Sequence, residues 1–90
     1  FYSYLDEECK VFGQRVARIM AQCRRAVERS RDSTIAAHRA ELLQMLDNAE
    51  TAYLREDWTS CAVCLAKIME VFTDSVFNRM RAEGKIPADV

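Results

Sequence analysis

Glycine and proline are scarce in this 90-residue chain, which has two glycines and a single proline, Pro87. A β-rich fold of this length needs several tight turns, and such turns draw on glycine and proline. Half of the residues are hydrophobic and 30% are charged, a balance typical of folded chains. The abundant Ala, Arg, Glu, Leu and Met favour helix. The sequence therefore predicts one all-α domain.

The chain also lacks an apolar run of the about 18 residues that a bilayer-spanning helix requires, so no transmembrane segment is expected. It contains no glycine-rich phosphate-binding motif, no H-E-x-x-H and no G-x-S-x-G. Its one histidine, His38, has no nucleophile beside it in a recognisable pattern. We therefore expect neither an enzyme nor a bound cofactor.

Apolar residues recur at helical spacing in three segments, predicted as helices over residues 4–29, 33–55 and 58–83. The first segment contains an uninterrupted heptad seam, Leu5, Cys9, Phe12, Val16, Ile19, Cys23 and Ala26. Three helices with short links pack most simply as an antiparallel up-down-up bundle. Because a seam this long can also serve between chains, a dimer formed through the first helix is the main alternative.

Capping residues punctuate these segments. Asp32 or Ser33 is placed to cap the second helix, and Asp57 the third. Gly84 and Pro87 are expected to end the third helix, since glycine and proline commonly follow a helix C-terminus. Residues 85–90 are then a frayed tail.

In the predicted hairpin of the second and third helices, small, aromatic and aliphatic residues recur at helical offsets: Ala49, Ala52, Trp58, Cys61, Leu65 and Ile68. Over about 25 residues this pattern is similar to a tetratricopeptide-type hairpin, whose small residues let two antiparallel helices approach closely. Glu56-Asp57 stands where that family usually has a glycine before the aromatic residue, and the chain holds no second copy. The resemblance implies a tightly packed helical hairpin rather than a repeat array.

Four cysteines, Cys9, Cys23, Cys61 and Cys64, permit two disulfides by number. The chain nevertheless lacks the loop-rich composition of small disulfide scaffolds, which favours a reduced, cytoplasmic protein. Cys9 and Cys23 are two heptads apart, about 21 Å along one helix, whereas bridged Cα atoms lie within about 7 Å. A disulfide between these two residues is therefore excluded.

The stretch "DWTSCAVC", residues 57–64, is the one segment that resembles a reactive site. Cys61 and Cys64 are three residues apart, so on a helix they share a face, and Cys61 lies about one turn beyond the helix start. The favoured interpretation is that both are small buried residues. A thiol-based redox sensor is an alternative, and a metal sensor that adds His38 to the two thiolates is another.

Basic residues are concentrated early in the chain: residues 10–39 contain eight bases against two acids, although the net charge is −1. Four arginines share one face of the first predicted helix, Arg15, Arg18, Arg25 and Arg29. Such a line can bind an acidic partner or a phosphate backbone. Alternatively, the acidic second and third helices neutralise it. Nucleic-acid binding is less favoured because no aromatic residues lie among the arginines.

Three aromatic residues, Phe1, Tyr2 and Tyr4, precede the heptad seam, and residues of this kind are enriched where proteins meet. With the arginine face, they predict a non-enzymatic interaction module that binds a protein partner as an adaptor, regulator or chaperone-like domain. We expect it to self-associate, most simply as a dimer.

Overall fold

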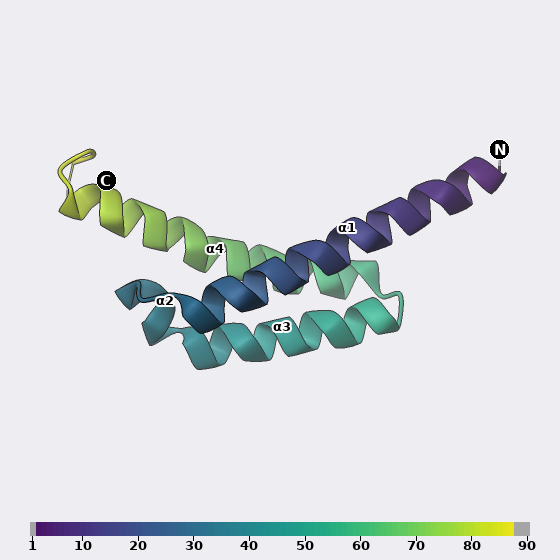
Figure 1. Cartoon of the computed structure of the whole chain (residues 1–90), viewed down its shortest axis with the longest axis horizontal. Coiled ribbons are helices and arrows are strands. Elements are labelled where there is room, and N and C mark those ends of the chain that lie inside the picture. The colour runs from purple at the N-terminus through teal and green to yellow at the C-terminus, as the bar shows by residue number, and fades with distance from the viewer. Residues whose placement is uncertain (1, 88–90) are drawn as a thin grey trace.

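The computed structural model describes residues 2–87, with the side chains of residues 2–6 and 9 left out. It contains four helices and no strand among these residues: α1 (Tyr2–Arg29), α2 (Ser33–Ala37), α3 (Arg39–Leu54) and α4 (Trp58–Ala82). The predicted all-α class is confirmed. Figure 1 shows α1 and α4 running in the same general direction, while α3 returns beneath them.

The second predicted helix, over residues 33–55, is divided in the structure. Helix α2 ends at Ala37, His38 leaves helical geometry at φ −108° and ψ 10°, and α3 begins at Arg39. At this break the Arg39 guanidinium donates hydrogen bonds to the backbone carbonyls of Val27 and Ser30. A cation placed on the last carbonyls of α1 satisfies groups that the helix itself leaves unpaired.

Helix α1 buries a different side from the predicted seam. Its buried residues are Gly13, Val16, Met20, Cys23 and Val27, again at 3-4 spacing. Of the predicted seam, Val16 and Cys23 are buried, whereas Phe12 and Ile19 are 53% and 41% exposed and Ala26 is also exposed. The side chains of Leu5 and Cys9 lie outside the described residues. The prediction was wrong for three of the five described seam residues because two adjacent apolar rows run along this helix, and α3 covers only one.

The α3–α4 hairpin is tight because small residues line it. Ala49, Ala52 and Cys61 are all less than one-tenth exposed. Helix α3 closes with the N–H of Asp57 bonded to the carbonyl of Ala52 and the N–H of Glu56 to that of Tyr53, a Schellman arrangement. Glu56 takes the left-handed conformation, with φ 58°, at the position where glycine is usual.

The predicted caps are confirmed at both later helix starts. The Asp32 carboxylate accepts the N–H groups of Thr34 and Ile35 at 2.9 and 3.2 Å. The Asp57 carboxylate accepts the N–H of Ser60 at 3.2 Å. These contacts satisfy N–H groups that a helix start leaves without a partner.

A polar contact joins α2 to the C-terminal half of α4. Asn78 donates to the Thr34 hydroxyl at 3.0 Å, and Arg79 lies 3.8 Å from the Asp32 carboxylate. Ser75 is buried, and its hydroxyl has no hydrogen bond of normal geometry. Ser75 lies close to Asp32 and is the largest cause of the lowered pKa of that carboxyl. The capped N–H groups and the charge of Arg79 also lower this pKa.

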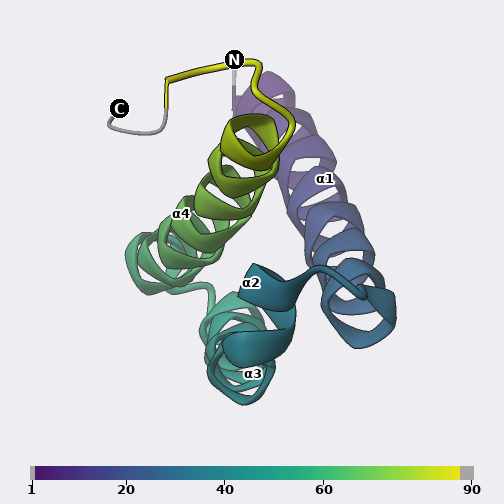
Figure 2. The same ribbon diagram turned by 90° about the vertical axis from the view of Figure 1, so that its left-hand side faces the viewer.

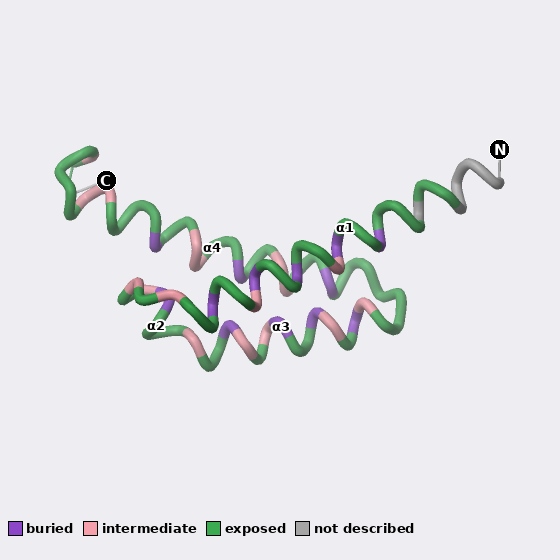
Figure 3. Tube along the Cα trace, viewed as in Figure 1, coloured by how far each residue is buried: buried purple, intermediate pink, exposed green. Residues whose placement is uncertain are grey.

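The buried residues form two adjoining clusters. One contains Cys23, Val27, Ile35, Leu42, Leu46 and Ile68. The other contains Val16, Met20, Ala49, Ala52 and Cys61. Leu65 packs against both and joins them. All of these residues lie along the stretch that α3 covers, as the purple segments of Figure 3 show.

The molecule is elongated because its helices differ in length. At about 1.5 Å per residue, α1 is about 42 Å long and α4 about 37 Å, but α3 only about 24 Å. The extents are 52 × 26 × 19 Å and the radius of gyration is 16.0 Å, against about 12 Å for a compact chain of this length. Figure 1 shows the N-terminal end of α1 and the C-terminal end of α4 projecting at opposite ends of the molecule, and Figure 2, seen along the long axis, shows α2 and α3 beneath α1 and α4.

Candidate protein interaction site

Four arginines of α1 form a line with which no described residue of the chain makes an ion pair. Arg15, Arg18, Arg25 and Arg29, hereafter the arginine line, are all exposed. The sequence raised the possibility that acidic residues of the later helices neutralise this face, and no such pairing occurs within residues 7–87.

The acidic residues of α3 pair instead with Arg24. Its guanidinium lies 2.8 Å from the Asp47 carboxylate and 2.9 Å from that of Glu50. Hydrogen bonds to both carboxylates raise the pKa of Arg24. The sequence analysis did not select Arg24, although its spacing from core residues indicates where it lies. Arg24 follows the core residue Met20 by four positions and precedes Val27 by three, so it borders the buried side of α1.

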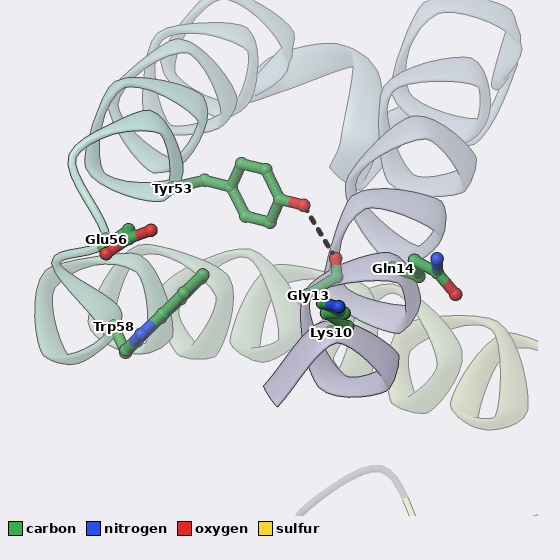
Figure 4. Close-up of a pocket in the computed structure, with 6 residues that line it drawn as sticks. All are labelled: Lys10, Gly13, Gln14, Tyr53, Glu56 and Trp58. Atoms are coloured by element: carbon green, nitrogen blue, oxygen red, sulfur yellow. Dashed lines mark hydrogen bonds between the residues drawn. The ribbon is translucent and has the colours of Figure 1, made fainter. Parts of the chain in front are cut away.

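Three aromatic rings meet where α1 passes the start of α4. The rings of Phe12 and Trp58 are 5.7 Å apart and those of Tyr53 and Trp58 are 5.5 Å apart, both edge to face. The Tyr53 hydroxyl donates to the carbonyl of Gly13 at 2.9 Å (Figure 4). A Cβ at Gly13 would stand 3.4 Å from that hydroxyl, an ordinary van der Waals distance.

An open pocket lies beside this corner, lined by Lys10, Gly13, Gln14, Tyr53, Glu56 and Trp58. The Tyr53 hydroxyl is already committed to Gly13, and the pocket contains no serine, threonine, cysteine or histidine. Its remaining polar side chains are Lys10, Gln14 and Glu56.

The C-x-x-C cysteines lie where the first helical turns of α4 meet the core. Cys61 is 2% exposed and Cys64 is half-buried, and both are free thiols, as is Cys23. Burial raises the pKa of Cys61, with the negative charges of Cys64 and Asp57 acting in the same direction. Burial likewise raises the pKa of Cys23. At neutral pH these buried thiols are protonated, which is the form that neither attacks electrophiles nor binds metals.

The structure does not bring His38 to the two cysteines. His38 is exposed at the α2–α3 break, where its Nδ1 lies 3.7 Å from the Glu41 carboxylate. The length of α3, about 24 Å, separates this break from the start of α4. Over the described part of the chain, no group of three or more His, Cys, Asp or Glu side chains is placed to hold a metal ion.

The predicted aromatic contacts cannot be placed. Phe1 lies outside the described residues, and so do the side chains of Tyr2 and Tyr4. The described aromatic residue nearest in sequence is Phe12, which sequence reasoning assigned to the heptad seam and which is 53% exposed.

A second uncovered surface runs along α4. Trp58, Met69 and Val76 are between 39% and 46% exposed and lie on one side of the helix. With exposed Ala62 and half-buried Leu65 and Phe72 between them, they form a row that we call the α4 stripe: Trp58, Ala62, Leu65, Met69, Phe72 and Val76. Val76 is 46% exposed although its neighbour Ser75 is 1% exposed, because Val76 lies on the side of α4 that α2 and α3 do not cover.

No helix within residues 2–87 is both long enough and apolar enough to cross a membrane. Comparisons with protein-family models, with curated proteins and with solved structures find no match to this chain. The arginine line and the α4 stripe are therefore the two surfaces from which function can be inferred.

Proposed function

We propose that this chain is a non-enzymatic protein interaction module, acting as an adaptor, regulator or chaperone-like domain, whose arginine line binds an acidic protein partner. The observation that carries the proposal is that Arg15, Arg18, Arg25 and Arg29 are exposed on one side of α1 without an ion pair to any described residue. Arginine suits this task because its planar guanidinium matches carboxylates in two-pronged contacts.

The surroundings of the line favour a protein over a small ion. Phe12 and Ile19 are exposed on the adjoining side of α1, which places apolar contacts next to the charges. Interfaces combine aromatic anchors and arginines in this way. An acidic amphipathic helix would pair its carboxylates with the line and its apolar side with these two residues.

The thiol and metal sensors are weaker candidates because burial keeps the Cys61 thiol protonated and His38 lies far from it. Free thiols at Cys23, Cys61 and Cys64 suit the reducing cytoplasm, where we place the protein. Binding of nucleic acid by the same arginines is the runner-up, and the following experiment separates it.

The test uses a labelled synthetic helix carrying Glu at i, i+3, i+7 and i+10 with leucines on one side, titrated against the chain by fluorescence anisotropy. We expect Arg18→Glu and Arg25→Glu each to weaken binding by about tenfold or more. Lys67→Glu is the matched control, because Lys67 is exposed on α4 and the substitution makes the same change in charge.

Equal losses in all three variants would contradict the proposal, since binding would then follow net charge alone. A parallel titration with a labelled DNA duplex of the same charge identifies the runner-up. Nucleic-acid binding is favoured if the duplex binds more tightly than the peptide. In that case Arg18→Glu and Arg25→Glu should weaken duplex binding, whereas Lys67→Glu should not.

A further inference from the structure

The α4 stripe is apolar throughout and has the spacing of a helix–helix seam. Its six residues are separated by 4, 3, 4, 3 and 4 positions, the pattern with which one helix packs along another. From Trp58 to Val76 it extends about 27 Å, or five turns. None of the six residues is charged, and the other helices of this chain leave the outer half of the stripe in water.

We propose that a second copy of this chain covers the stripe, with the two α4 helices antiparallel and related by a twofold axis level with Lys67. The dimer rests on a surface other than the arginine line, so either proposal can fail while the other stands.

The order of residues along the stripe is self-complementary about Lys67. In an antiparallel pair, Trp58 meets Val76 of the second copy, and Leu65 meets Met69. Ala62, the smallest residue, meets Phe72, so a gap on one copy receives a large ring from the other. A parallel pair would instead set Phe72 against Phe72 and Ala62 against Ala62, which crowds one level and leaves a void at another. A twofold interface uses one surface twice, as this order allows.

The exposed area of the chain matches what such a dimer removes. The solvent-accessible surface is 6,679 Å², whereas a compact monomer of this mass exposes about 5,400 Å². The excess is about 1,300 Å², and a stable interface buries about 800 Å² on each partner. Much of the surface that this chain exposes beyond a compact monomer can therefore be covered by one copy of itself.

Small residues beside the stripe let a second helix approach closely. Ala66 and Thr73 lie on its outer side, next to Met69, and line a shallow hollow there. Glu70 and Asp74 complete the rim of the hollow, where both stay in contact with water. Protein interfaces commonly combine a closely packed centre with a polar rim that stays accessible to water.

The same dimer also covers the aromatic corner. Trp58 and Val76 lie at opposite ends of the stripe. Because the pair is antiparallel, the last turns of the second copy's α4 therefore pass over Trp58. Trp58 touches Phe12 of α1 at a ring separation of 5.7 Å. Trp58 is therefore the point at which the second copy comes nearest to α1.

Molar mass decides the proposal. Sedimentation equilibrium of the wild-type chain is expected to give twice 10.4 kDa at high concentration. Met69→Glu and Val76→Glu each place two carboxylates in the interface, so the dissociation constant should rise at least about 100-fold. Val63→Glu is the matched control, because Val63 lies on the same helix, is 50% exposed and is off the stripe. Circular dichroism checks that each variant remains helical.

A wild-type chain that stays monomeric to millimolar concentration would overturn the proposal and leave the stripe to another protein. Dissociation by Val63→Glu to the same degree would overturn it too. Spin labels introduced as an unnatural amino acid test the orientation: labels at Ala66 should be close together, whereas those at Thr59 are offset by about 24 Å along the axis. Equal distances at both positions would mean a parallel pair and contradict the proposed packing.

Discussion

Helix α4 carries two rows of residues at heptad spacing, and among the described residues only one row is covered by other helices. Cys61, Ile68 and Ser75 are seven positions apart and no more than 2% exposed. One residue further on, Met69 and Val76 are 42% and 46% exposed. The difference arises because α2 and α3 together cover one side of α4, and no other long helix of the described chain lies along the second side. Periodicity thus identifies apolar surfaces, whereas the length and number of neighbouring elements decide which of them are buried.

Two adjacent residues of α4 provide the largest expected difference between the rows. Ile68→Ala should lower the free energy of unfolding by about 3–4 kcal/mol, because it empties a fully buried site. Met69→Ala, measured at a concentration low enough to keep the chain monomeric, should cost less than about 1 kcal/mol. Urea denaturation followed by circular dichroism measures both. Similar losses would mean that both rows are packed within one chain.

Glu56 lies just before the stripe and offers a smaller effect of opposite sign. Its φ of 58° is unfavourable for a residue with a Cβ, so Glu56→Gly should stabilise the monomer by about 0.5–1 kcal/mol. Gly84 has a φ of 73°, and space around it is not limiting, since an added Cβ would meet nothing within 4 Å. Gly84→Ala should therefore destabilise the chain by about 1 kcal/mol through backbone conformation alone. Thermal denaturation of the two variants checks both signs, and a destabilising Glu56→Gly would contradict the conformational argument.

The smallest effect concerns the polar end of the covered row, where Asp32 lies against Ser75 and Arg79. The pKa of Asp32 is lower in the folded chain than its usual value of 3.8. Its stabilising contribution is therefore present above the unfolded pKa and is lost as the pH falls through the folded pKa. Asp32→Asn keeps a capping side chain but does not titrate, so its stability should decline less steeply than that of the wild type below about pH 4. Urea midpoints measured between about pH 6 and pH 2 give the comparison; identical slopes would contradict it.

The local features of the fold were predictable because they depend on neighbouring residues. Asp32 and Asp57 cap helices, and Gly84 ends α4, as side-chain and backbone chemistry alone require. The close approach of α3 and α4 was likewise foreseeable from Ala49 and Ala52.

The break at His38 and the choice between apolar rows on α1 were not predictable. No glycine or proline marks the break; its visible partner is Arg39, which reaches back to the end of α1. The first helix presents two apolar rows of similar quality, and only the position of α3 selects Met20 over Ile19. Both features depend on contacts between residues far apart in the sequence.

The candidate site was predictable in part for the same reason. Helical spacing alone groups the arginine line, but whether those arginines are already paired depends on where the carboxylates of α3 fall. In the structure these carboxylates meet Arg24, which sequence reasoning did not select. The α4 stripe was not predicted because the sequence shows only that Ile68, Met69, Ser75 and Val76 lie on neighbouring sides of one helix, and the positions of α2 and α3 decide which side is buried.

Hydroxyl-radical labelling of methionine and valine side chains at increasing protein concentration tests most directly whether the α4 stripe is an interface. Met69 and Val63 are exposed to similar degrees in the single chain, at 42% and 50%, and Met20 is buried at 4%. The account predicts that labelling of Met69 falls several-fold as concentration rises, while Val63 stays reactive and Met20 stays protected. Constant labelling of Met69 over the full range would contradict it.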